Sequence, residues 1–97
     1  MALINRIVWA PSASEDLKQA FEYIGADSPA AAREFVQNIM RQAEKLARFP
    51  KIGRVIPEIG SPRYRELIVG EYRIFHEVSK HQLTIFRVFH SKRLFSG

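Results

Sequence analysis

The chain has 97 residues, and 46% of them are hydrophobic, so we expect residues 1–97 to form one domain around one modest core. There is no cysteine, which excludes disulfide bonds and thiolate metal sites and suits a reducing compartment. The net charge of +5 is uneven: residues 1–47 carry five basic and six acidic side chains and sum to −1, whereas residues 48–97 carry ten and four and sum to +6. Such a basic half favours a surface that binds an anion, either nucleic acid or an acidic polypeptide.

The N-terminal segment predicts a strand rather than a targeting sequence. Residues 1–9 are too short, and too interrupted by Asn5 and Arg6, to form a signal peptide. No apolar run approaches the ~20 residues of a membrane span, so we expect a cytoplasmic protein that does not contact a membrane. Side-chain alternation over residues 4–9 predicts a short strand that stops at Ala10-Pro11.

A first amphipathic helix is predicted after this strand. Ser12 and Glu15 have the spacing of a capping box, in which the hydroxyl and the carboxylate each bond a backbone amide at the helix start. Apolar residues recur every three or four positions up to Ile24, and Gly25 is expected to end the helix.

A second, longer helix follows a connection of about three residues. Ser28 is a suitable N-cap, and Pro29 fits the first helical position. An apolar stripe then continues to Phe49-Pro50, where the helix is expected to stop. Such a short connection makes the two helices antiparallel neighbours, so an αα-hairpin is predicted.

The rest of the chain predicts a loop and a β-meander. Residues 50–62 hold three prolines and two glycines, which is loop chemistry. Aromatic and β-branched residues, separated by tight turns at Gly70-Glu71 and Lys80-His81, then predict three strands, over residues 64–69, 72–79 and 82–90. The fold class is α+β in the order β-α-α-β-β-β, with the hairpin on one face of a mostly antiparallel four-stranded sheet.

Basic residues are the main candidates for a functional site. A cationic groove would bind an RNA backbone and stabilise the transition state of phosphodiester cleavage. A histidine near neutral pKa would transfer the proton, with the RNA 2′-hydroxyl as nucleophile. The candidates are Arg73, Arg87 and His90 for the chemistry, and Arg63, Arg65, Lys92 and Arg93 for binding.

Simpler interpretations of the same residues stay open. Arg87 is also consistent with a solvated strand face, or with an ion pair to Glu66 or Glu77, and His90 with a packed strand end. Nothing in the sequence fixes His76 and His90 on one face, so no metal site is predicted, and no cofactor motif is present.

Three stretches of the chain together resemble the RelE/ParE superfamily of toxins, also called plasmid stabilisation proteins. They are "IVWAPSASEDLKQAFEYIGADSPAAAREFVQNI", "ARFPKIGRVIPEIG" and "YRELIVGEYRIFHEVSKHQLTIFRVFHSKR". The resemblance implies the toxin of a type II toxin–antitoxin module that arrests growth. It also implies a cognate antitoxin whose acidic, largely disordered end folds over the toxin, and operator DNA binding only through that complex.

The resemblance leaves the cellular target open. The long hairpin is closer to ParE toxins, which poison DNA gyrase. In RelE-type nucleases, which cut messenger RNA on the ribosome, an arginine matching Arg73 and a residue near His90 or Lys92 belong to the site. The tail "KRLFSG" lacks the terminal tyrosine of such sites, and only Lys51 and Arg54 stand for their lysine-rich stretch. A third hypothesis is a non-toxic member that only binds its antitoxin.

Overall fold

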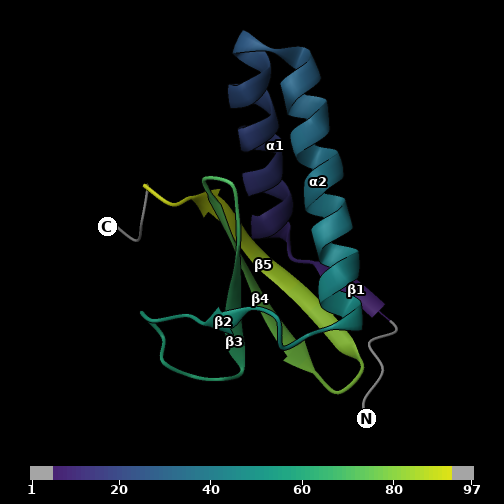
Figure 1. The fold of residues 1–97 in the computed structure, drawn as a ribbon, viewed down its shortest axis with the longest axis vertical. Helices are drawn as coiled ribbons and strands as arrows, with labels where there is room; N and C mark the ends of the chain where they lie inside the picture. Colours follow the sequence, from purple (N-terminus) through teal and green to yellow (C-terminus); the bar gives the residue numbers. More distant parts are fainter. Residues whose placement is uncertain (1–5, 93–97) are drawn as a thin grey trace.

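The computed structural model describes residues 6–92, in which two helices cover one face of a five-stranded sheet (Figure 1). Within residues 6–92, neither helix has the length and the apolar character that a membrane span requires. The elements in chain order are β1 (Arg6–Trp9), α1 (Pro11–Asp27), α2 (Pro29–Arg48), β2 (Arg54–Val55), β3 (Tyr64–Val69), β4 (Tyr72–Ser79) and β5 (Gln82–His90).

The sheet has the strand order β1-β5-β4-β3-β2. β1 is parallel to β5, and the other neighbours are antiparallel. The predicted α+β class and the helical hairpin on a mostly antiparallel sheet are confirmed. The predicted count of four strands is wrong, because Arg54 and Val55 pair with Glu66 and Arg65 as a fifth. A strand of two residues is too short to show any periodicity in the sequence.

The start of α1 differs from the prediction. The helix begins at Pro11, a residue that fits the first turn because it lacks an amide hydrogen, and its N-cap is Ala10 without a side-chain bond. Ser12 is not a cap: its hydroxyl donates to the Phe86 carbonyl on β5, 2.7 Å away. The capping box with Glu15 is therefore absent, because the serine bonds a distant strand instead of its own helix.

The turn of the hairpin is tighter than expected. α1 continues past Gly25 to Asp27, and Ser28 serves both helices. The Ser28 amide donates to the Ile24 carbonyl, and its hydroxyl accepts from the Ala31 amide, so it is C-cap of α1 and N-cap of α2. The predicted roles of Ser28 and Pro29 and the end of α2 before Phe49 are confirmed. Figure 1 shows that this turn projects well beyond the sheet.

The core lies between the hairpin and one face of the sheet. Side chains alternate along a strand, so one register row places Leu67, Ile74 and Val88 toward the helices. The core cluster comprises Ala13, Ile39, Ala43, Val69, Ile74, Ile85 and Val88. The opposite face of β3, β4 and β5 is left without a covering helix, and we call it the open face.

Candidate functional site

Two register rows of the open face contain charged and aromatic side chains together. The first row runs across β3, β4 and β5 through Glu66, Phe75 and Arg87. The next row contains Ile68, Arg73 and Phe89. Strand pairing therefore brings two of the candidate arginines, Arg73 and Arg87, to the same face.

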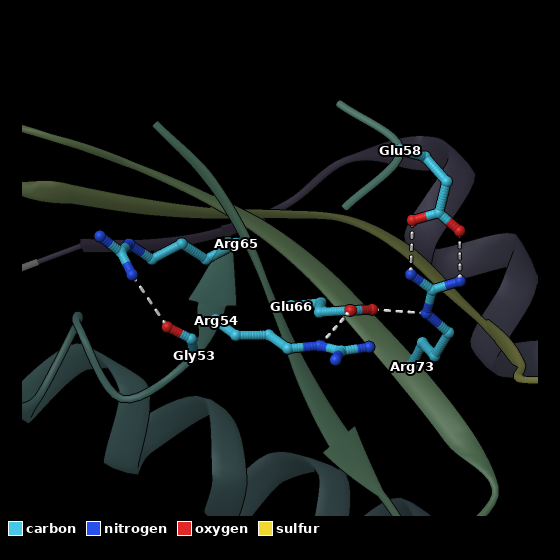
Figure 2. Close-up of polar contacts among 6 residues, drawn as sticks. All are labelled: Gly53, Arg54, Glu58, Arg65, Glu66 and Arg73. Atoms are coloured by element: carbon cyan, nitrogen blue, oxygen red, sulfur yellow. Dashed lines mark hydrogen bonds and ion pairs between the residues drawn. The ribbon is translucent and has the colours of Figure 1, made fainter. Parts of the chain in front are cut away.

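Arg73 is buried and bound by two carboxylates (Figure 2). Its Nε donates to Glu66 Oε1, while Nη1 and Nη2 form a bidentate pair with Glu58 at 3.0 and 2.9 Å. The guanidinium also lies over the Phe75 ring, 4.9 Å from its centroid. The Glu58 hydrogen bonds are the main cause that raises the pKa of Arg73, so this residue is a fixed cation.

Glu66 is the centre of this cluster. It is fully buried and accepts from Arg73 on β4 and from Arg54 Nε on β2, the latter at 2.7 Å. Hydrogen bonding to Arg73 lowers the pKa of Glu58, which keeps it ionised. Arg54, Glu58, Glu66 and Arg73 thus form a set with two positive and two negative charges, which we call the Arg73 cluster.

Arg87 is paired with α1 rather than with either predicted partner, Glu66 or Glu77. Its Nε lies 2.8 Å and its Nη2 3.3 Å from the Asp16 carboxylate, and its guanidinium lies 5.5 Å from the Phe89 ring centroid. The hydrogen bonding of the Arg87 guanidinium, which donates to the Asp16 carboxylate, is the main cause that raises the pKa of Arg87. This cation is therefore also matched by an acid.

The predicted binding residues Arg63, just before β3, and Arg65, in β3, are also engaged. Arg63 Nε donates to Glu77 on β4. Arg65 pairs with His76 in the ladder, on the helix side of the sheet, and its Nη1 donates to the Gly53 carbonyl at 3.0 Å. These two side chains do not join Arg73 in one groove.

His90 lies on the other side of the sheet from Arg73. It pairs with Tyr72, and the two rings stack edge-on at 5.2 Å. Its Nε2 is 3.4 Å from Glu71, and its Nδ1 accepts from the Lys92 amide at 3.2 Å. Lys92 is exposed beyond the strand, and the candidate Arg93 lies outside the described residues. The structure therefore separates His90 from the two arginines of the open face.

His76, which the sequence analysis considered only as a metal ligand, is a buried residue packed against Gly53. His76 is fully buried, and neither ring nitrogen has a hydrogen-bond partner among residues 6–92. Burial lowers its pKa to about 4, and the nearby Arg65 charge adds to the effect. Gly53 lies directly against the ring, so an added Cβ would be 2.7 Å from His76 Cε1.

The ion pairs of the site were not predicted as they occur: Glu66 was named as a partner of Arg87, and Asp16 and Glu58 were not named. Asp16, Glu58 and Glu66 each meet an arginine from another element. Their pairing depends on strand register and on the placement of a loop, so only the alternation that puts Glu66 and Ile68 on one face was visible beforehand. Groups of three or more metal-ligating side chains do not occur within residues 6–92.

Comparison with known proteins gives consistent matches over most of the chain. Residues 7–95 match the family model for the ParE toxin of the type II toxin–antitoxin system parDE. The chain is 33% identical over 90 residues to Toxin RelE2 from Caulobacter vibrioides, which covers 92% of this chain and 98% of that protein.

Solved structures show the same fold. The chromosomal ParDE system from P. aeruginosa has a chain that matches with a TM-score of 0.72 and 22% identity, covering 91% of this chain and 96% of that one. The RelB-RelE antitoxin-toxin complex from Methanococcus jannaschii matches with a TM-score of 0.59 and 22% identity, covering 91% and 94%. At these identities the likeness shows the fold alone.

Proposed function

Because the chain belongs to the ParE toxin family of type II toxin–antitoxin systems, we propose that it arrests growth by binding and poisoning DNA gyrase. Membership makes it a toxin of the RelE/ParE superfamily, whose members act on more than one target. The choice of gyrase rests on how the candidate residues are arranged.

The main support for gyrase binding is that each candidate arginine on the open face is paired with a carboxylate, so the face has no free cationic groove. Arg73 is bound by Glu58 and Glu66, and Arg87 by Asp16. Cleavage of RNA without a metal ion needs cations that face the phosphate and a nearby group that transfers a proton. His90 lies on the opposite side of the sheet from both arginines. This arrangement favours a protein that acts by binding.

The helical hairpin is the element that we propose for gyrase binding. It projects beyond the sheet in Figure 1, and α1 and α2 are 17 and 20 residues long. Phe21 and Tyr23, in the last two turns of α1, are 41% and 66% exposed. Exposed aromatic side chains are typical of the anchor positions of protein interfaces.

The proposed partner in the resting cell is a cognate antitoxin with an acidic, disordered segment. The related structures from P. aeruginosa and M. jannaschii are toxin–antitoxin complexes. A basic chain with a net charge of +5 suits an acidic segment that folds on binding. Contact with operator DNA would then occur only through the antitoxin.

A second candidate is a ribosome-dependent messenger RNA endonuclease (an mRNA interferase). It is favoured by the 33% identity to Toxin RelE2 and by the position of Arg73 and Arg87 on one face. This candidate requires opening of the Arg73 cluster and a contribution from His90 or Lys92. It therefore predicts that His90→Gln abolishes toxicity.

Pulse labelling of DNA and protein synthesis just after induction of the chain alone tests these candidates. Gyrase poisoning predicts that thymidine incorporation falls before methionine incorporation. The paired substitution Phe21→Ser and Tyr23→Ser should relieve the arrest, whereas the control His90→Gln should leave it intact. If methionine incorporation falls first and His90→Gln is harmless to cells, the endonuclease replaces our proposal. Normal growth at high expression would contradict both candidates and support the third hypothesis, a non-toxic protein that only binds its antitoxin.

A further inference from the structure

The two carboxylates that bind Arg73 are held in very different ways. Glu66 is part of β3, fully buried, and shared with Arg54. Glu58 lies in the loop between β2 and β3, and its side chain is 38% exposed. Figure 2 shows Glu58 approaching the guanidinium from outside the sheet, while Glu66 meets it within the sheet. Glu58 is therefore the one carboxylate that can leave without opening the sheet.

The short turn that carries Glu58 is closed by the backbone of the buried Ile56. Ile56 is fully buried, and its carbonyl accepts from the amides of Ile59 and Gly60. Gly60 has a φ of 74°, a conformation that glycine adopts without strain. The buried Ile56 holds the start of the turn, while Ile59 in the turn is 45% exposed.

Departure of Glu58 would leave a preorganised receptor for another carboxylate. Arg73 Nε would stay bound to Glu66, and the guanidinium would stay stacked on Phe75. Its two Nη atoms would then form an open fork, the geometry that binds a carboxylate in a bidentate manner. Without Glu58 the remaining charges, Arg54, Glu66 and Arg73, sum to +1.

The surroundings of this fork are apolar. Ile68 pairs with Arg73 across the ladder and is 50% exposed, and Phe89 flanks Arg73 on its other side. Ile59, next to Glu58 in the turn, is 45% exposed. A ligand for this surface would bring an acidic group together with apolar side chains.

We infer that the open face carries a binding site for an acidic and apolar peptide segment, in which Glu58 occupies the place of a partner carboxylate on Arg73. The inference extends the proposed antitoxin partner by giving its acidic segment a docking point, and in that respect it rests on the proposed function. Glu58 competes with the partner, so the Arg73 cluster is neutral in the free protein and exchanges one carboxylate for another on binding.

A peptide fits these observations better than a nucleic acid. The group that Arg73 binds in the structure is a carboxylate, and the single positive charge released with Glu58 is small for a phosphate backbone. The neighbouring cations Arg87 and Arg63 have their own acids, Asp16 and Glu77. Exposed isoleucine beside the fork supplies contacts that an acidic peptide with leucine side chains can bury.

Fluorescence anisotropy with the purified chain tests the site. The probe is a fluorescein-labelled 12-residue peptide of three Glu-Glu-Leu-Leu repeats, and the control peptide has glutamine in place of each glutamate. Removal of the competing carboxylate by Glu58→Gln should tighten binding of the acidic peptide roughly fivefold. The matched control Glu77→Gln removes an acid from another arginine pair of the same sheet and should leave the affinity unchanged.

The double variant Arg73→Gln with Glu66→Gln removes the fork without leaving a buried charge unpaired. It should stay folded by circular dichroism and bind the acidic peptide no better than the glutamine peptide. An unchanged or weaker affinity of folded Glu58→Gln would overturn the inference. Absence of peptide binding in both wild type and Glu58→Gln would also overturn it. The same holds if Glu58→Gln tightens the binding of a uridine dodecanucleotide but not that of the acidic peptide. Peptide binding requires no gyrase, so failure of the gyrase proposal would leave this result unaffected.

Discussion

The Asp16 carboxylate of α1 accepts a hydrogen bond of 2.9 Å from the backbone amide of Val88 on β5. β1 pairs with β5 only as far as Ile85, so within residues 6–92 no strand lies beside the rest of that edge. The Ser12 hydroxyl bonds the Phe86 carbonyl and Asp16 bonds the Val88 amide, so side chains of α1 satisfy the edge that β1 leaves. The same carboxylate binds Arg87.

Substitution of Asp16 should therefore cost more than substitution of its arginine partner. Asp16→Ala leaves the part-buried Val88 amide without its acceptor. We expect a loss of about 2 kcal/mol in the free energy of unfolding. Arg87→Gln keeps that bond and removes a cation that is 46% exposed, so solvent screening limits its cost to about 0.5 kcal/mol. Urea unfolding of both variants measures the difference, and equal losses would argue against the edge role of Asp16.

Substitution of Glu66 should lower the free energy of unfolding more than substitution of Glu77. Glu66→Gln leaves Arg73 buried with only the exposed Glu58 as an anion, and we expect a loss of about 3 kcal/mol in the free energy of unfolding. Glu77→Gln breaks a pair with an arginine that is 61% exposed, so its cost should stay below about 1 kcal/mol. Chemical unfolding of the two variants under the same conditions provides the comparison. A similar small loss for both would show that the Arg73 cluster contributes little.

Two glycines should respond oppositely to alanine. Gly53→Ala places a Cβ 2.7 Å from both the Glu66 carbonyl and the His76 ring, and we expect a loss of about 2 kcal/mol in the free energy of unfolding. Gly25→Ala lies inside α1, where the new Cβ would meet Ala32 Cβ at an ordinary 3.5 Å. The helix should gain up to about 1 kcal/mol from the better helix former. Thermal unfolding measures the loss of stability in Gly53→Ala and the gain in Gly25→Ala. A Gly53→Ala protein as stable as wild type would contradict the tight packing on His76.

The buried His76 should make stability depend on pH. Its folded pKa of about 4 is lower than the ordinary 6.5, so between these values the unfolded chain binds a proton that the folded chain does not. The free energy of unfolding should therefore be constant above about pH 6.5 and fall by roughly 3 kcal/mol in total as pH drops toward 4. Urea unfolding from pH 7 to 4 measures the slope. The variant His81→Gln, at an exposed site, should keep this slope, whereas the core variant His76→Gln should reduce it. A slope that is unchanged in His76→Gln would mean that another group causes the pH dependence.

Local patterns were sufficient to predict most elements of this fold. The 3.6-residue period predicts both helices, and β-branched and aromatic runs between turns predict the three meander strands, all of which the structure contains. Two features depend on contacts far apart in the sequence. β2 exists because Arg54 and Val55 pair with β3, and the Ser12 hydroxyl bonds the Phe86 carbonyl of β5 instead of capping α1.

The site was harder to predict, because arginine function depends on its partners. Alternation along β5 already places Arg87 and Phe89 on one face and His90 on the other, so their separation was visible in the sequence. The acids were not predictable in this way. Glu58 reaches Arg73 from a loop, and Asp16 reaches Arg87 from a helix 71 residues earlier in the chain. A count of basic residues therefore overstates the free positive charge of the open face.

The most direct test of the gyrase proposal is a supercoiling assay with the purified chain, purified gyrase and relaxed plasmid DNA. We predict that wild-type protein and the His90→Gln variant stop supercoiling and accumulate cleaved DNA at micromolar concentrations. The Phe21→Ser and Tyr23→Ser protein, with its exposed hairpin aromatics removed, should do neither. Unchanged supercoiling with folded wild-type protein that cleaves ribosome-bound messenger RNA would contradict the proposal and assign the toxin to the endonuclease class.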